Sequence, residues 1–339
     1  MNDEFANQTL NGFRRTRRHL TRNLALGLAV VLAGASALAQ GGGGQAVHLI
    51  VPLAPGGIAD ITARPLAIPL AKALGQTVIV ENRIGAGGAV GMGYAAKQKA
   101  DGNTLLMALS SIVIIPEAEK VMGRIPSYTL SQFTPIALVS ADPTVLVVRS
   151  NSPWKTIGDL VKDAKAKPKT LSFSSSGIYG TTHVAQSMLW QAAGVELLHV
   201  PYNGGGPSLL ALLAGQVDIT AQAPGTVAAL VKAGTVRVLG TWGAERLKGS
   251  PEVPTFKEQG LDVEFYIWSA LFAPAGLPAP KLAQLRVAAK RAIQDPGFNS
   301  AMSTMNTPIR YMEGAELDRF LEQDQKRLAD VVKAMGKLE

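Results

Sequence analysis

The sequence predicts an α/β protein built as two lobes that crossing strands connect. Short apolar runs alternate with glycine-rich turns and helical stretches, an order typical of parallel sheets flanked by helices. This alternation occurs in two series, which the β-branched strand Thr144–Val148 separates. The 339 residues, of which 47% are hydrophobic and 17% charged, are enough for two domains with cores of their own.

The first series begins with a strand, a sharp turn and a helix. The apolar run Val47–Leu53 predicts the strand, and the Pro-Gly-Gly sequence that follows ends it. Asp60 is placed to cap or flank the start of the helix, and we expect Pro65 and Pro69 to delay that start or to kink the helix. Asp60 and Arg64, four residues apart, predict an ion pair on the helix surface worth about 0.3–0.5 kcal/mol.

The later elements follow from the same alternation. The first series continues with strands 78–80 and 104–109. Between them, a glycine-rich turn at 85–91 leads into a helix through 94–97. After Thr144–Val148 we expect helices 157–165, 182–193, 208–214 and 227–232 and strands 171–173, 197–200, 217–220 and 236–239. The pattern changes near Phe265, and helices 280–294 and about 315–335 are expected to return to the first lobe. We therefore assign residues 46–141 and 265–339 to lobe 1 and residues 142–264 to lobe 2.

Composition excludes several classes of site. The chain has no cysteine, which excludes disulfides, thiol catalysis, cysteine zinc sites and a lipid anchor on an N-terminal cysteine. The net charge is +8, but five arginines and two acidic residues lie within residues 1–40, so the rest holds 28 basic and 23 acidic side chains. That remainder has no stripe of basic residues, so we expect no nucleic-acid partner.

Residues 1–40 predict a signal peptide. Five arginines between Arg14 and Arg22 precede an uncharged apolar run from Leu24 to Leu38, which is short for a membrane span. Ala37-Leu38-Ala39 is a small-x-small cleavage site, so we expect cleavage near Ala39 and a periplasmic protein. The sequence Thr16-Arg17-Arg18-His19-Leu20 resembles a twin-arginine signal, with an ordinary secretory signal or an uncleaved anchor as the alternatives.

Four turns share one chemistry and indicate an anion site. Each follows a predicted strand, precedes an assigned helix or a segment that could form one, offers backbone N–H groups or hydroxyls, and contains no lysine or arginine; they span residues 55–60, 110–111, 176–183 and 201–208. N–H groups at a helix start form the positive end of the helix dipole, and ligands of open α/β sheets bind at the carboxyl ends of strands. Two such ends, one from each lobe, would hold a small anion with neutral donors. For any one turn, the alternative is a connection that needs glycine only for its dihedral angles.

Motifs for catalysis, cofactors and metals are missing. His183 is a lone histidine at a helix start and is interpreted as structural or as a helix-terminal hydrogen-bonding residue. No G-x-S-x-G sequence frames a nucleophile. Gly85–Gly91 departs from the dinucleotide fingerprint because Val90 occupies the place of its third glycine. The four histidines have no metal-ligand spacing. We expect no catalytic residue, no metal and no cofactor.

A series of ordered motifs covers nearly the whole chain after the leader, and together these closely resemble the tripartite tricarboxylate transporter (TctC) solute-binding proteins, also called the Bug family. The motifs are Val51-Pro52-x-x-Pro55-Gly56-Gly57-x-x-Asp60 with Ala63-Arg64, Leu74-Gly75-Gln76, Val80-Glu81-Asn82-Arg83, Gly85-Ala86-Gly87-Gly88, Asp101-Gly102-x-Thr104-Leu105-Leu106, His199-Val200-Pro201-Tyr202, Gly215-Gln216-Val217-Asp218 and Phe272-Ala273-Pro274-Ala275-Gly276.

The resemblance implies a two-lobed periplasmic-binding-protein fold of type II with a hinge of two crossing strands. It implies a monomer that captures a small organic carboxylate and delivers it to membrane transporter subunits of the tripartite tricarboxylate type, or that serves a sensor kinase. The ligand loops of the family correspond here to Pro55, Gly56, Gly57, Ile58, Ala59, Asp60, Ser110, Ser111, Gly180, Thr181, Thr182, His183, Tyr202, Asn203, Gly204, Ala223 and Pro224.

The sequence departs from the family pattern at two of these positions. Ile58 stands where serine, glycine or threonine is common, which removes a side-chain donor or narrows the pocket. Ala223 stands where many members have an aspartate, the natural partner of a ligand ammonium group. These departures predict a carboxylate without an amino group.

Two other functions remain open at this stage. One is a periplasmic enzyme that acts on a carboxylate with His183 as its base. The other is a regulatory effector domain of similar lobed fold, against which the leader and the lack of a helix-turn-helix motif argue.

Overall fold

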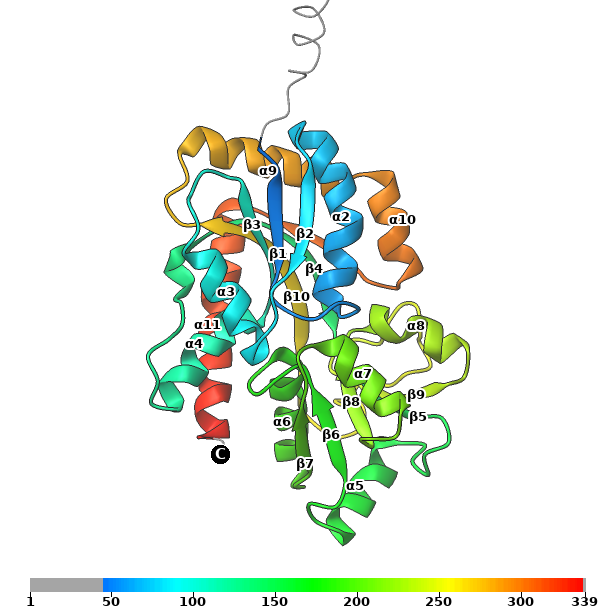
Figure 1. Cartoon of the computed structure of the whole chain (residues 1–339). Helices are drawn as coiled ribbons and strands as arrows, with labels where there is room; N and C mark the ends of the chain where they lie inside the picture. The colour runs from blue at the N-terminus through cyan, green and yellow to red at the C-terminus, as the bar shows by residue number, and fades with distance from the viewer. Residues whose placement is uncertain (1–44, 338–339) are drawn as a thin grey trace, which may run out of the picture. The chain divides into compact units, whose positions relative to one another are not determined.

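The computed structural model describes residues 45–337 (Figure 1). The predicted signal peptide lies outside the described residues. Within residues 45–337, no helix combines the length and apolarity that crossing a membrane requires.

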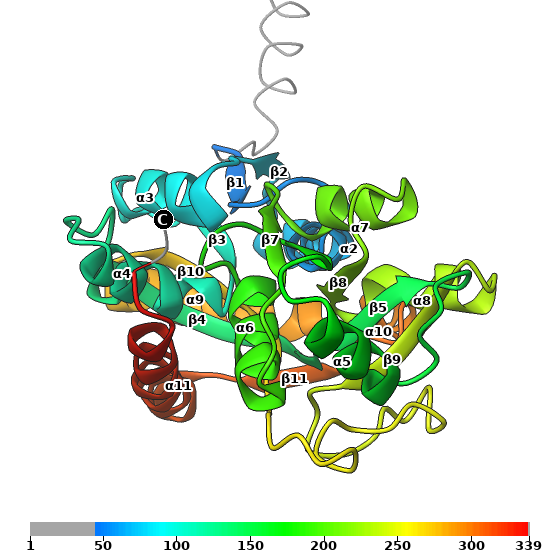
Figure 2. The ribbon, with the colours of Figure 1, turned by 90° about the horizontal axis from the view of Figure 1, so that it is seen from below.

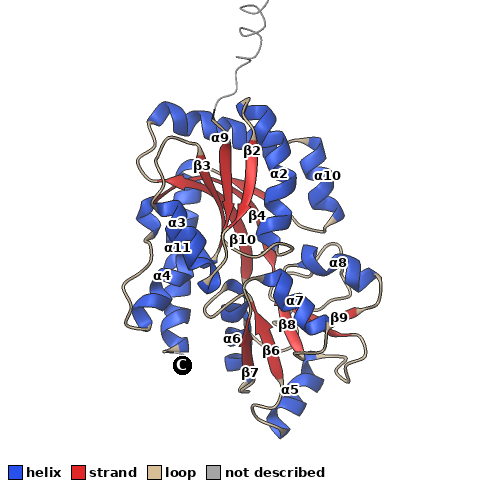
Figure 3. Ribbon diagram, in the orientation of Figure 1, coloured by secondary structure: helices blue, strands red, loops and turns tan. Residues whose placement is uncertain are grey.

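The larger of two sheets has six strands in the order β11-β4-β10-β3-β1-β2 (Figure 3). In that order they are Ile309–Met312, Phe133–Pro143, Tyr266–Pro274, Thr104–Leu109, Val47–Val51 and Val78–Asn82. β1 is parallel to both of its neighbours, β2 and β3, whereas β10 is antiparallel to β3 and β4. Leu49 and Ile50 of β1 are fully buried, as expected of a central strand with helices on both faces.

Helices cover both faces of this sheet (Figures 1 and 2). On one side lie α2 (Ile58–Leu74), α9 (Ala279–Ile293) and α10 (Pro296–Thr304), and on the other α3 (Ala89–Ala96), α4 (Ser111–Val121) and α11 (Gly314–Met335). Two short 3₁₀ turns, η1 (Ala86–Gly88) and η2 (Leu130–Gln132), precede α3 and β4. α11 is tied to the sheet because Trp268 donates a hydrogen bond of 2.7 Å from Nε1 to Asp324 Oδ2. The segments after residue 265 therefore complete this lobe.

The second sheet has five strands in the order β7-β6-β8-β5-β9. In that order they are Leu198–Pro201, Ser172–Ser175, Ile219–Gln222, Val145–Arg149 and Val236–Thr241. α5 (Ile157–Ala166) and α6 (Thr181–Ala193) lie on one face, and α7 (Gly205–Leu213) and α8 (Pro224–Lys232) lie on the other (Figure 2). Alternate residues of β5 serve the two faces: Val145 and Val147 pack with Leu212 of α7, whereas Leu146 belongs to the main core.

Two segments cross between the sheets side by side. β4 runs into β5 through Thr144, and β9 returns to β10 through residues 242–265. Thr144 accepts a backbone hydrogen bond of 2.9 Å from Trp242 and donates one of 3.3 Å to Phe265. This is the two-lobed architecture that the alternating elements predict. We propose that 46–141 with 265–339 and 142–264 are the bounds of lobes 1 and 2.

The first helix differs from the prediction. α2 begins at Ile58 and contains both Pro65 and Pro69, so of the two expected outcomes, a late start or a kink, the late start is wrong. The buried side chains of Leu66 and Leu70 anchor the helix in the core, and this packing outweighs the backbone hydrogen bonds that the prolines remove.

Several elements were not predicted as regular structure. No strand was predicted for Phe133–Pro143, Tyr266–Pro274 or Ile309–Met312, and no helix for Ser111–Val121 or Pro296–Thr304. The three strands depend on pairing with segments distant in the sequence. β4, for example, forms bonds with β10 along its whole length despite two register shifts.

Candidate functional site

In lobe 1, the parallel strands bring two predicted turns to one edge of the sheet. β1 and β3 are neighbours with His48 opposite Thr104 and Ile50 opposite Leu106. Their carboxyl ends therefore lie next to each other, and the turn 53–57 and Ser110-Ser111 follow them.

In lobe 2, three turns meet in the same way. β6 is parallel to β7 and β8, with Ser174 opposite both Val200 and Thr220. The turns at 176–180, 202–204 and 223–224 therefore lie at one edge, each at the start of a helix. All five predicted loops thus lie at the carboxyl ends of strands.

Backbone contacts join the two edges. The Ala54 N–H donates a hydrogen bond of 3.0 Å to the Asn203 carbonyl in the other lobe. A Cβ atom at Gly57 would lie 3.3 Å from the Gly205 nitrogen, and one at Gly206 would overlap the Pro55 carbonyl oxygen. The lobes approach this closely only because glycine lines both sides.

A second cross-lobe contact involves a loop that the sequence analysis did not include in the site. Gly87 of η1 lies against the turn before α6, where a Cβ atom at Gly177 would be 2.7 Å from the Gly87 Cα. Tyr179 of the same turn donates a hydrogen bond from its hydroxyl to the Gly336 carbonyl at the end of α11. Gly85–Gly88 contributes to the family resemblance but was given no place in the site, although its run of glycines was a usable signal of close backbone approach.

No side chain caps the five helices that begin at these turns. The residues before α2, α4, α6, α7 and α8 accept no side-chain hydrogen bond from their helices; they are Gly57, Ser110, Gly180, Gly204 and Ala223. The first four N–H groups of a helix have no partner within it, and they form the positive end of its dipole. The turns therefore supply several neutral donors for an anion.

Ser110 and Ser111 carry buried hydroxyl groups without a protein partner. The two residues are 0% and 1% exposed, and neither Oγ atom has a hydrogen-bond partner within residues 45–337. A buried hydroxyl left without a partner costs about 1–3 kcal/mol, so a partner from outside the chain is the natural explanation. Tyr128 stabilises this helix start, because its hydroxyl donates a 3.1 Å hydrogen bond to the Ile112 carbonyl.

Asp60 holds the first turn in place. Its carboxylate accepts hydrogen bonds from the Gly56 N–H at 3.1 Å, from Asn82 at 3.0 Å and from Arg64 at 3.1 Å. Burial raises the pKa of Asp60, but these hydrogen bonds outweigh it, and the pKa lies below its ordinary value. The predicted Asp60–Arg64 pair is present. The prediction that this pair lies on the helix surface is wrong for Asp60. Asn82 of β2 helps to cover the carboxylate, and Asp60 is only 4% exposed.

His183 supports the turn before α6. Its Nδ1 accepts the Tyr179 N–H at 2.9 Å, which confirms the prediction of a helix-terminal hydrogen-bonding residue. Its ring stacks on His199 with centroids 3.7 Å apart, and His199 Nε2 lies 2.6 Å from Ser175 Oγ. Burial, and then the neighbouring His199, hold the pKa of His183 well below its usual value, and burial lowers the pKa of His199 to about 4. Both rings are therefore neutral at pH 7.

The two threonines of this turn, Thr181 and Thr182, lie close to another residue of the same turn. Thr182 Oγ1 accepts the Ser176 N–H at 2.8 Å and lies 3.1 Å from Ser176 Oγ. Thr181 Oγ1 is 3.4 Å from the same hydroxyl, and the residue is 1% exposed. The side chains of this turn fix its shape, which leaves the backbone N–H groups as the donors.

The remaining predicted side chains lie away from the meeting of the turns or in the core. Ile58, Ala59 and Ala223 are buried in the main hydrophobic core. The Tyr202 hydroxyl is 3.4 Å from Gln216 Oε1, beyond the far end of α7. At these positions only the backbone N–H groups are available as hydrogen-bond donors to a ligand.

Gln222 was missed. Its Nε2 donates a hydrogen bond of 3.1 Å to the Gly205 carbonyl, and the residue is 2% exposed. It supports the start of α7 from the neighbouring strand. Nothing in its local sequence indicates this role, because it depends on the pairing of β8. Within the described part of the chain, no group of three or more histidine or acidic side chains is arranged to hold a metal ion.

Residues 62–337 match the family described as "Tripartite tricarboxylate transporter family receptor" (TctC). The chain belongs to this family. The resemblance inferred from the ordered motifs is therefore confirmed. That description names receptors of a transporter family, and BugD, which shares the fold, is a periplasmic binding protein, so the coarse function is solute binding.

Solved structures show the same fold. The structure of the periplasmic binding protein BugD is 30% identical, with a TM-score of 0.80, and the match covers 85% of this chain and 96% of BugD. MatC (Rpa3494) from Rhodopseudomonas palustris, with bound malate, is 28% identical over 85% of this chain and 98% of its own, with a TM-score of 0.78. Rpa4515 from R. palustris, with adipate, is 27% identical over 85% and 96%, with a TM-score of 0.80. The predicted two-lobed periplasmic-binding-protein fold is confirmed.

Proposed function

We propose that this TctC protein captures a small organic carboxylate that lacks an amino group where the turns of its two lobes meet, and that it does so without chemical conversion. The carboxylate would dock on N–H groups at the starts of α2 and α4 from one lobe and of α6, α7 and α8 from the other. The observation that carries the proposal is the pair of buried hydroxyls of Ser110 and Ser111 at the start of α4, which have no hydrogen-bond partner in the described part of the chain.

The chemistry of the turns supports an anionic ligand. A carboxylate accepts several hydrogen bonds at once, and uncharged donors in a buried site orient it strongly. Two relatives of the same fold are solved with malate and with adipate, which are both dicarboxylates without an ammonium group. Ala223 offers no charge to an ammonium group, which favours such ligands here.

Calorimetric titration tests this ligand class. We expect malate or adipate to bind the purified protein and glutamate and aspartate to bind at least about 100-fold more weakly, because a buried ammonium without a partner is costly. Mass spectrometry of ligand released from gently purified protein would identify the natural carboxylate. Tight binding of glutamate or aspartate would contradict the proposal.

Replacing Ser110 or Ser111 with alanine tests the docking point. We expect each variant to lose about tenfold in affinity for the dicarboxylate that binds, because each removes a charge-assisted hydrogen bond. The melting temperature without ligand should stay unchanged or rise, since the lost hydroxyl has no partner among the residues that the structure describes. Ser174→Ala is the matched control, because Ser174 Oγ is buried and bonded at 2.7 Å to Ser208. That variant should lose stability instead. Unchanged affinity in both alanine variants would remove these serines from the site.

We propose that the protein works in the periplasm, exported by the signal at residues 1–40, and that it serves either a tripartite tricarboxylate-type transporter or a sensor as a monomer. Closure of the lobes around the ligand would be a population shift, driven by contacts made only when both lobes engage it. Nothing in the geometry favours the enzyme alternative. His183 Nδ1 is occupied by the Tyr179 N–H, and its lowered pKa makes it a weak base.

A further inference from the structure

Tyr179 has a backbone conformation that few residues other than glycine adopt. Its φ is +54°, in the left-handed region, where a side chain costs energy. The residue is fully buried and lies in the turn before α6, whose N–H groups belong to the proposed carboxylate site. Glycine would suit this backbone angle better, and the same turn has glycine at 177 and 180. The tyrosine side chain therefore indicates a role beyond the shape of the turn.

The side chain of Tyr179 connects the two lobes. Within lobe 2, its ring packs edge to face on His183, with the centroids 6.0 Å apart and the planes at 63°. The Tyr179 N–H is bonded to Nδ1 of the same histidine. On the other side, the Tyr179 hydroxyl donates its hydrogen bond to the carbonyl of Gly336, the residue that ends α11 in lobe 1. One residue thus joins the turn before α6 to the end of a helix of the other lobe.

α11 is a fixed part of lobe 1. Its buried side chains recur on one face of the helix, which packs against α4 and β4; they are Leu317, Leu321, Asp324, Leu328 and Val332. Asp324 is also bonded to Trp268 of β10. Towards its end the helix runs beside α6 of lobe 2 (Figure 1). The position of the Gly336 carbonyl is therefore set by lobe 1, although its hydrogen-bond donor belongs to lobe 2.

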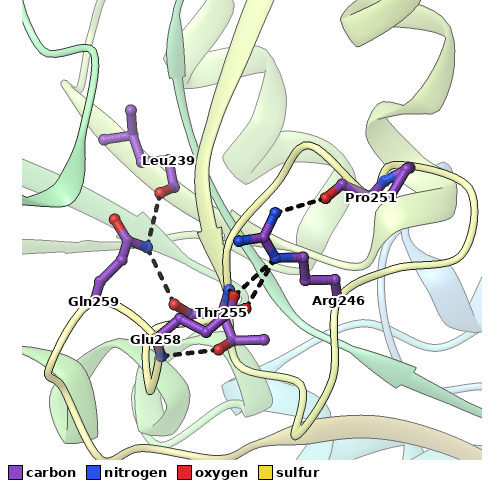
Figure 4. Close-up of polar contacts among 6 residues, drawn as sticks. All are labelled: Leu239, Arg246, Pro251, Thr255, Glu258 and Gln259. Carbon is purple, nitrogen blue, oxygen red and sulfur yellow. Dashed lines mark hydrogen bonds and ion pairs between the residues drawn. The ribbon is translucent and has the colours of Figure 1, made fainter.

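The segment that returns from lobe 2 to lobe 1 is fixed to lobe 2. Arg246 donates from Nε to both carboxylate oxygens of Glu258, at 3.0 and 2.9 Å (Figure 4). Gln259, the next residue, donates a hydrogen bond of 3.3 Å to the Leu239 carbonyl of β9. Lobe 2 thus extends as one body up to the crossing strands. An opening of the lobes about those strands would break the hydrogen bond between lobe 2 and the end of α11.

We propose that Tyr179 is a positioning residue of the carboxylate site, and that its hydrogen bond to Gly336 is a latch between the closed lobes. The bond forms only when the lobes are closed, so it stabilises that state alone. The latch also holds the turn before α6, and with it the N–H groups of that helix, in place against lobe 1. This role rests on the function proposed above, whereas the latch itself can be measured without a ligand.

Two introduced cysteines that carry fluorescent labels measure the closed fraction, since the chain has no cysteine of its own. Ile125 in lobe 1 and Lys165 in lobe 2 are exposed positions for them. In single-molecule energy transfer without ligand, we expect Tyr179→Phe to lower the ratio of closed to open molecules by about 2- to 10-fold, because it removes one hydrogen bond. Removal of residues 336–339 deletes the acceptor and should have an effect of the same size.

The two changes combined should lower the ratio no further than either change alone, because both remove the same bond. The dicarboxylate that binds, malate or adipate, should dissociate from Tyr179→Phe faster by the same factor, with its association rate unchanged. Tyr311→Phe is the matched control, since Tyr311 lies in β11 within lobe 1. It should change neither the ratio nor the dissociation rate, and circular dichroism should show every variant folded.

The latch is overturned if Tyr179→Phe leaves the ratio of closed to open molecules unchanged. It is also overturned if the combined variant loses the product of the two single effects, because the two groups would then act independently. If the shortened chain does not fold, Tyr179→Phe alone decides. A wild-type protein that closes through the latch but binds neither malate nor adipate would contradict the proposed carboxylate site and leave the latch standing.

Discussion

Replacing Gly206 with alanine should weaken dicarboxylate binding by about 100-fold while both lobes stay folded. A Cβ atom at Gly206 would overlap the Pro55 carbonyl oxygen and lie 3.3 Å from the Gly56 carbonyl carbon, and all three residues are at the meeting of the lobes. The clash is between lobes, so it opposes their approach and spares each core. Affinity then falls with the fraction of molecules that can close.

Two measurements check this result. Calorimetry with adipate reports the affinity, and small-angle X-ray scattering reports the radius of gyration, which should increase in Gly206→Ala whether or not ligand is present. Gly158→Ala in α5 is the control, since a Cβ atom there meets only Thr156 Oγ1 at 3.6 Å. An unchanged radius of gyration together with unchanged affinity would show that close approach at Gly206 is not needed.

Replacing Asp142 with asparagine should remove a loss of stability that the wild-type protein suffers as pH rises. Asp142 lies at the end of β4, is fully buried and accepts a 3.0 Å hydrogen bond from Ser140 through Oδ2, while Oδ1 has no partner within residues 45–337. Burial raises the pKa of Asp142 from 3.8 to about 8, although the Ser140 hydrogen bond lowers it. The folded protein therefore keeps this proton at pH values where the unfolded chain has lost it.

The direction in which the free energy of unfolding changes with pH follows from proton linkage. Between pH about 4 and about 8 the folded state binds one more proton at Asp142 than the unfolded state, so the free energy of unfolding falls by about 1.4 kcal/mol per pH unit from this group. His183 and His199 act in the opposite direction, because their lowered pKa values destabilise the fold as pH falls below about 6.5. Together these three groups favour greatest stability near pH 6.5.

Urea unfolding from pH 5 to pH 8.5 measures the effect. The difference in unfolding free energy between Asp142→Asn and the wild type should grow as pH rises to about 8 and then level off. Asp318→Asn, at an exposed position of α11, should show no such difference. Parallel pH profiles for the wild type and Asp142→Asn would mean that Asp142 is ionised in the fold.

The family and the glycine-rich turns were accessible from the chain alone because they depend on local chemistry. The Pro-Gly-Gly turn and the ordered motifs from Val51 to Gly276 needed no tertiary contact to be identified. The elements that were missed depend on pairing between distant segments. β11 is four residues long and exists because it pairs with β4, about 170 residues earlier in the chain.

The α/β class, the two series of elements and the glycine turns follow from neighbouring residues, since strand alternation and turn dihedrals are local properties. Which polar groups already have hydrogen-bond partners depends instead on contacts between distant segments of the fold. The fold buries Asp60 beneath Asn82, stacks His183 on His199, leaves the Ser110 and Ser111 hydroxyls without partners among residues 45–337, and brings Gly206 against Pro55. Those outcomes depend on which strand ends become neighbours, and the close approach of separate lobes is not encoded at any single position.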